Sequence, residues 1–184
     1  MKFPCLIPLI PLAWSLSVLF AGAGAADEEV VLDDHQVIVQ VRGVVCSFCA
    51  HGTEKNLAEL SFLDPAHFGG DGVLMDIHTQ RITLALDPDT PVDYGAIHQA
   101  ITDGGYDAER AYVRVRGVVE QGDGRVLLTS ASNGQAYRLD GVETGLPAPA
   151  GPVTVEGEVS ANDMARLADG EPVPLRVTAI EGAQ

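Results

Sequence analysis

Residues 36–60 read QVIVQVRGVVCSFCAHGTEKNLAEL, and the hydrophobic pattern changes its period within this stretch. From Gln36 to Arg42 hydrophobic and polar residues alternate, which is typical of a half-buried strand. From Cys49 to Leu60 the hydrophobic residues recur with helical spacing. Ala50, Leu57 and Leu60 lie on one face of such a helix, together with Thr53. The sequence therefore predicts a strand that passes through a loop with two cysteines, Cys46 and Cys49, into a helix.

The following residues extend this pattern to a complete βαββαβ order. Alternating runs at 73–77 and 82–86 predict a hairpin. Thr90 as N-cap and Pro91 at the first helical position predict a second helix, which Gly104 ends. A further strand begins at Tyr112. This order predicts a ferredoxin-like fold, in which two helices cover one face of a four-stranded antiparallel sheet.

The remainder of the chain consists of short strand-like runs separated by glycine-rich turns, with one short helix after Ser160 as N-cap. Evenly spaced short strands predict a small barrel, weakly similar to an OB-fold. The expected fold class is thus α+β, with a ferredoxin-like βαββαβ domain at 36–111 followed by a small all-β barrel-like domain at 112–184.

The first 26 residues have the features of a secretory signal peptide. Lys2 precedes a hydrophobic run, and small residues follow it up to Ala26. We expect cleavage after Ala25 or Ala26, a solvated acidic lead-in at 27–35, and a secreted or periplasmic protein. A membrane contact is expected only if this segment stays uncleaved.

The net charge of the chain limits the classes of partner that it can bind. The chain has 26 Asp and Glu against 11 Lys and Arg, a net charge of −15. Such a surface repels nucleic acid, so nucleic-acid binding is excluded. The acidic excess suits either a solvated surface or docking to a basic patch on a partner. The sequence holds no recognisable nucleophile–base pair or phosphate-binding glycine loop, so no hydrolase activity is expected.

The two cysteines of the predicted loop point to soft-metal chemistry. Thiolates three residues apart converge on a soft d¹⁰ ion that accepts two or three ligands, such as Cu(I) or Hg(II). Structural zinc needs four ligands, more than this pair supplies. A redox-active pair and an idle disulfide are the alternatives, because an oxidising compartment acts on exposed thiols.

The same residues resemble the heavy-metal-associated (HMA) domain family, which includes copper chaperones and periplasmic mercury-binding proteins. The match covers about residues 36–115 and is carried by Gly43, Cys46, Cys49, Glu54 and Leu57 and by the pair Gly105 and Tyr106. The resemblance implies that Cys46 and Cys49 bind the metal and that Tyr106 packs beside them. Val44 stands where the family has Met. His51 is a possible third ligand, and Phe48 lies between the thiols in sequence.

The expected function is therefore extracytoplasmic binding of Cu(I) or Hg(II), for sequestration or for transfer by ligand exchange. A metal transporter or acceptor protein with a basic surface is the expected partner, and no enzyme activity is expected. A thiol–disulfide oxidoreductase that uses the same pair is the alternative from the enzyme class. A third possibility is an interaction module that acts through the C-terminal barrel.

Overall fold

The structure is a computed structural model that describes residues 30–44, 47–142, 151–168 and 170–182, with the backbone alone for residues 47–49. The predicted signal peptide, the first three residues of the acidic lead-in and Cys46 lie outside the described residues. None of the described helices has the length and hydrophobicity needed to cross a membrane.

Eight strands and three helices make up the described chain. The first six elements follow the order β-α-β-β-α-β, and four strands and a short helix come after them. In chain order they are β1 (Gln36–Arg42), α1 (Ser47–Ala58), β2 (Val73–Asp76), β3 (Arg81–Ala85), α2 (Tyr94–Asp103), β4 (Asp107–Gly122), β5 (Arg125–Ser130), β6 (Ala136–Asp140), β7 (Val153–Ser160), α3 (Ala161–Arg166) and β8 (Val173–Gly182).

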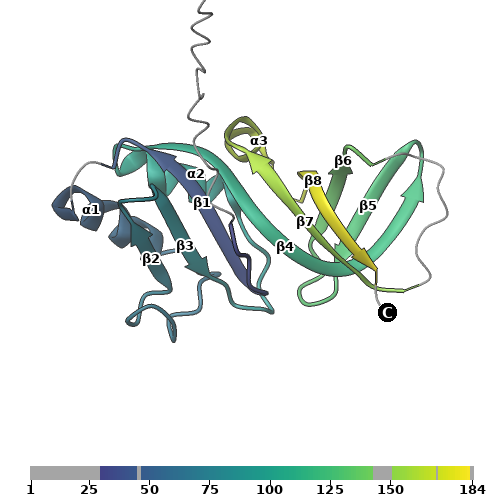
Figure 1. Cartoon of the computed structure of the whole chain (residues 1–184), viewed down its shortest axis with the longest axis horizontal. Coiled ribbons are helices and arrows are strands. Elements are labelled where there is room, and N and C mark those ends of the chain that lie inside the picture. Colours follow the sequence, from purple (N-terminus) through teal and green to yellow (C-terminus); the bar gives the residue numbers. More distant parts are fainter. Residues whose placement is uncertain (1–29, 45–46, 143–150, 169, 183–184) are drawn as a thin grey trace, which may run out of the picture.

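All eight strands belong to one sheet, in the order β2-β3-β1-β4-β5-β6-β8-β7. An additional pairing of β4 with β7 closes the last five strands of this order into a barrel, and β1, β2 and β3 extend from it (Figure 1). The molecule is thus mostly β. The expected fold class, a ferredoxin-like βαββαβ domain followed by a separate small barrel, is wrong.

The reason for this difference is the length of β4. It has 16 residues and begins at Asp107, before the predicted strand start at Tyr112. Its first part pairs with β1 through Val113, and its last part pairs with β5 from Gly117 onward. Because the same strand serves both parts, the predicted boundary between 111 and 112 falls inside a continuous strand. Figure 1 shows β4 crossing from the three extending strands to the barrel.

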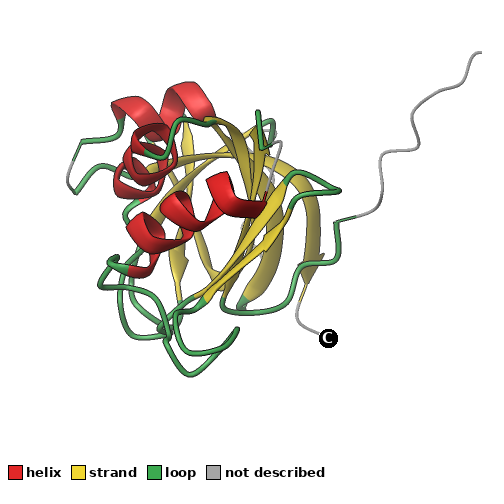
Figure 2. Ribbon diagram, turned by 90° about the vertical axis from the view of Figure 1, so that its left-hand side faces the viewer, coloured by secondary structure: helices red, strands yellow, loops and turns green. Residues whose placement is uncertain are grey.

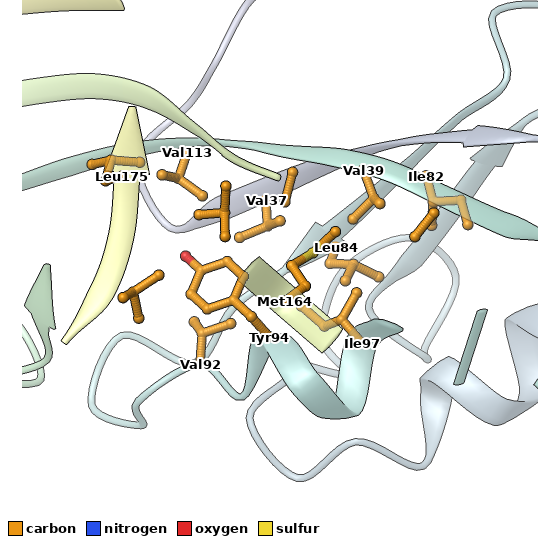
Figure 3. Packing of buried hydrophobic residues seen from close by; sticks show 14 of the residues in the cluster. Val37, Val39, Ile82, Leu84, Val92, Tyr94, Ile97, Val113, Met164 and Leu175 are labelled. Atoms are coloured by element: carbon orange, nitrogen blue, oxygen red, sulfur yellow. The ribbon is translucent and has the colours of Figure 1, made fainter. Parts of the chain in front are cut away.

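The hydrophobic core is likewise continuous across the molecule. One cluster of buried side chains includes Val39 of β1, Ile97 of α2, Leu128 of β5 and Leu175 of β8. The helices lie together on one side of the strands (Figure 2). In Figure 3, Met164 of α3 lies among side chains of α2, β1 and β3. The short third helix therefore seals the core between the barrel and the extending strands.

Several other local predictions are confirmed, and the predicted start of the second helix is wrong. The first strand has the predicted bounds, the 73–86 region forms the predicted hairpin, and Ser160 caps α3 through the N–H of Asp163. The second helix begins later than predicted. Its N-cap is Asp93 and not Thr90, because the Asp93 carboxylate accepts a hydrogen bond from Ala96 N–H. An aspartate competes well for this position because its side chain reaches the free N–H groups of the first turn.

Candidate metal-binding segment

The predicted metal-binding segment follows β1 directly. At Gly43 the backbone takes φ = 98°, a left-handed conformation that glycine adopts without steric cost. The next residue, Val44, is buried. The chain therefore turns sharply after the strand, and the Val44 side chain fixes it to the core two residues before Cys46.

A glutamine from the β2–β3 turn holds the backbone of Val44. Gln80 Oε1 accepts a hydrogen bond from Val44 N–H at 3.0 Å, and Gln80 Nε2 donates to the Val44 carbonyl at 2.5 Å. The same Nε2 also donates to the carbonyl of Ile77 at 2.7 Å. An amide side chain thus satisfies both polar groups of a buried residue, as a neighbouring strand would do.

Tyr106 also lies against this turn. It is 7% exposed, and its ring approaches within 3.7 Å of where a Cβ on Gly43 would be. Tyr106 follows the turn that ends α2, in which Gly104 packs directly on Thr53 of α1. The resemblance implies a neighbour of the metal segment at Tyr106, and the structure places this residue beside Gly43.

Helix α1 begins at Ser47, so Cys49 lies in its first turn. The helix packs through Ala50, Thr53 and Leu57, three of the four residues on the predicted buried face. The fourth, Leu60, follows the end of the helix and is half-buried. Cys46 and the side chains of Phe48 and Cys49 lie outside the described residues. The structure therefore defines both flanks of the segment and the backbone position of one cysteine.

The predicted extra ligand His51 points to solvent. Its side chain is 78% exposed, and Nδ1 lies 3.6 Å from the Glu54 carboxylate on the same helix. Within the described part of the chain, no three His, Cys, Asp or Glu side chains gather as a metal site would require. The prediction that Cys46 and Cys49 are ligands is untouched by this finding, because it rests on side chains that are not described.

A cavity of about 550 Å³ lies at the other end of β1, where β4 passes into the barrel. Its lining includes Val37, Tyr94, Val115, Ser130 and Tyr137. A volume of this size falls in the range of small-molecule pockets. Three pairs of polar side chains in its lining bond to each other: Tyr94 with Tyr137, Ser130 with Ser132, and Arg114 with Asp34.

Tyr94 and Tyr137 belong to a buried chain of hydrogen bonds that joins α2 to the barrel. Tyr137 donates to Gln135 Oε1 at 3.1 Å, and the Gln135 amide is bound to both backbone groups of Val92. Since Tyr137 has one proton, the 3.3 Å contact between hydroxyls makes Tyr94 the donor to Tyr137. Burial raises the pKa of Tyr137 to about 12 and raises that of Tyr94 well above its usual value.

No family model, curated protein or solved structure matches this chain. The resemblance of residues 36–115 to HMA domains therefore stays a prediction.

Sequence reasoning missed two groups of residues that the structure brings into view. Gln80 gave no signal beyond its place in a predicted hairpin turn, because its partner Val44 is 36 residues away. Tyr94 lies in the second helix that the sequence predicted, but its bond to Tyr137 joins residues 43 positions apart. Contacts at such separation leave no periodic trace in a single sequence.

Proposed function

We propose that this protein binds a soft heavy-metal ion, Cu(I) or Hg(II), outside the cytoplasm through the thiolates of Cys46 and Cys49. It holds the ion for sequestration or for transfer to a partner protein. The observation that carries the proposal is the position of Cys49 in the first turn of α1, three residues after a second cysteine and a few residues after the turn at Gly43.

The position of Cys49 favours its charged form. The first turn of a helix has free N–H groups and the positive end of the helix dipole, which lower the pKa of a thiol. The first turn of α1 contains no acidic residue that would oppose this effect. A thiolate is the form that binds soft metal ions, so the site suits them at neutral pH.

Two thiolates leave the ion open to a further ligand. An incoming thiolate from a partner adds to the ion, which then has three sulfur ligands. Cys46 or Cys49 leaves next, and repetition of these two steps moves the ion to the partner without its release into water. The acidic surface of the chain favours a partner whose docking face is basic.

Metal titration of the reduced protein tests the proposal. Competition with a chromophoric Cu(I) chelator is expected to give one tightly bound ion per chain. The double variant Cys46→Ser, Cys49→Ser is expected to lose more than about 100-fold in affinity, because both soft ligands are gone. Met164→Leu is the control, because it removes a sulfur atom that is fully buried in the core, and it should bind as the wild type does.

Equal binding by the wild type and the double variant would overturn the proposal. Turnover of a disulfide substrate together with weak metal binding would support the oxidoreductase alternative instead, and the reduction potential of the pair would place it among known redox proteins.

A further inference from the structure

We propose that the cavity between β1, β4 and β5 binds a small hydrophobic zwitterion, an amino acid or a dipeptide, through Arg116 and Asp87. The cavity lies at the end of β1 away from the predicted cysteine pair, so this inference does not depend on the proposed function. It is carried by two opposite charges without a charged partner that line one cavity with hydrophobic walls.

The cavity forms where β1 and β5 part along one edge of β4. Pairing of β1 with β4 ends at Val113, and pairing of β5 with β4 begins at Gly117. Both residues also pair with β7, which therefore occupies the opposite edge of β4. The fork between β1 and β5 is thus a product of the fold, and its volume of about 550 Å³ suits a small molecule.

The walls of the cavity are largely aliphatic. Val37, Val92, Val113 and Val115 contribute to the lining, and each of them is buried. Figure 3 shows Tyr94 between Val92 on one side and Val37 and Val113 on the other. A hydrophobic side chain of a ligand would gain free energy here by leaving water.

Four Asp and Arg side chains line the same cavity, and two of them neutralise each other. Asp34 Oδ1 lies 3.3 Å from Arg114 Nε. Arg116 has no side-chain hydrogen bond or ion pair with any described residue. The Asp87 carboxylate accepts a hydrogen bond from Asp89 N–H at 2.9 Å but meets no cation in the described part of the chain. One positive and one negative charge therefore remain for a ligand.

This pair of charges selects the class of ligand. A guanidinium binds a carboxylate, and a carboxylate accepts hydrogen bonds from an ammonium group. A simple anion would be repelled by Asp87 and a simple cation by Arg116, whereas a zwitterion satisfies both. The Ser130 and Ser132 hydroxyls are 3.0 Å apart, so one donates to the other and one hydroxyl hydrogen is left for an oxygen of the ligand.

Isothermal titration calorimetry of the purified protein tests the proposal with two zwitterions, leucine and leucyl-leucine. Each is compared with its N-acetyl form, which lacks the ammonium group, and with its amide, which lacks the carboxylate. We expect one site per chain, and binding of either blocked form should be about 10-fold weaker than that of the parent zwitterion. The tighter of the two zwitterions identifies the ligand as an amino acid or as a dipeptide.

Two variants test the charges one at a time, after circular dichroism has shown that each is folded. Arg116→Gln should abolish the preference for the parent zwitterion over its amide. Asp87→Asn keeps an acceptor for the N–H of Asp89 and should abolish the preference over the N-acetyl form. Arg125→Gln and Asp123→Asn are the matched controls, because both residues lie at the β4–β5 turn outside the lining. They should keep both preferences.

Three results would overturn the proposal. The first is that neither zwitterion binds to the wild type at millimolar concentration. The second is that an N-acetyl form or an amide binds as tightly as its parent, because the site would then not read both charges. The third is that Arg116→Gln and Asp87→Asn keep the wild-type preferences, or that the controls lose them equally.

Discussion

Gly104, at the C-terminal end of α2, lies in a crowded place, whereas Gly52, in the middle of α1, lies in an open one. A Cβ at Gly104 would overlap the hydroxyl of Thr53, so α1 and α2 can approach this closely only with glycine there. Around Gly52, in the middle of α1, no atom lies within 4 Å of such a Cβ. The same methyl group therefore has opposite effects at the two positions.

We expect Gly104→Ala to lower the free energy of unfolding by about 1–3 kcal/mol, because the added carbon forces the two helices apart. Gly52→Ala should raise it by about 0.5–1 kcal/mol, since alanine is the better helix former. Urea denaturation of both variants checks this. A shift of the same sign in both would contradict the packing described for Gly104.

At the scale of the element, the start of α2 offers two candidate N-cap residues, Thr90 and Asp93. Asp93 accepts a hydrogen bond from Ala96 N–H at 2.9 Å, whereas Thr90 contributes its carbonyl to Asn133 Nδ2. Alanine at position 90 keeps that carbonyl, and alanine at position 93 removes the cap.

We therefore expect Asp93→Ala to lower the free energy of unfolding by about 1 kcal/mol. Thr90→Ala should change it by less than about 0.5 kcal/mol. Thermal melting of the two variants side by side measures the difference. A larger loss of stability in Thr90→Ala than in Asp93→Ala would indicate that Thr90 is the N-cap, as the sequence predicted.

The elements show what local sequence can predict. The first strand was predicted with its bounds because alternation of Val37, Val39 and Val41 is a local signal. The cap of α2 was not, because Thr90, Pro91 and Asp93 all suit a helix start and the choice depends on three-dimensional fit. The site follows the same rule. The cysteine spacing can be read from the sequence, whereas the hydrogen bond between Val44 and Gln80 joins residues 36 positions apart.

At the scale of the molecule, the fold class was missed because of β4. Its residues alternate from Asp107 onward in a pattern that suits one long strand or two shorter ones equally well. The pairing of this strand with β7 closes the barrel, and register between strands some 40 residues apart cannot be read from periodicity. The order of the elements was thus predictable, whereas their union in one sheet was not.

The Tyr94–Tyr137 pair gives the whole molecule a dependence on high pH. The pKa of Tyr137 is raised from 10.0 to about 12, chiefly by burial. Below pH 10 the phenol is protonated in both states, and stability does not change. Between pH 10 and 12 the unfolded chain loses the proton and the folded chain keeps it, so the free energy of unfolding falls, by about 3 kcal/mol for a shift of this size.

Urea denaturation at pH 8, 10 and 11.5 measures this fall. In Tyr137→Phe the group is absent, so stability should decline less steeply over the same range, although it starts lower at pH 8 because the bond to Gln135 is lost. Tyr94→Phe should behave in the same direction. Parallel pH profiles for the wild type and both variants would contradict the burial of the pair.

Closure of the barrel also governs how copies of the chain can meet. Exposed strand edges invite another chain to add its own strand, which is a common route to aggregation. Because β7 pairs with both β8 and β4, the described sheet leaves its outermost edge at β2, which is four residues long. An edge this short offers few free backbone groups to a second molecule. Strand addition between copies of the chain is therefore disfavoured, even in a concentrated solution.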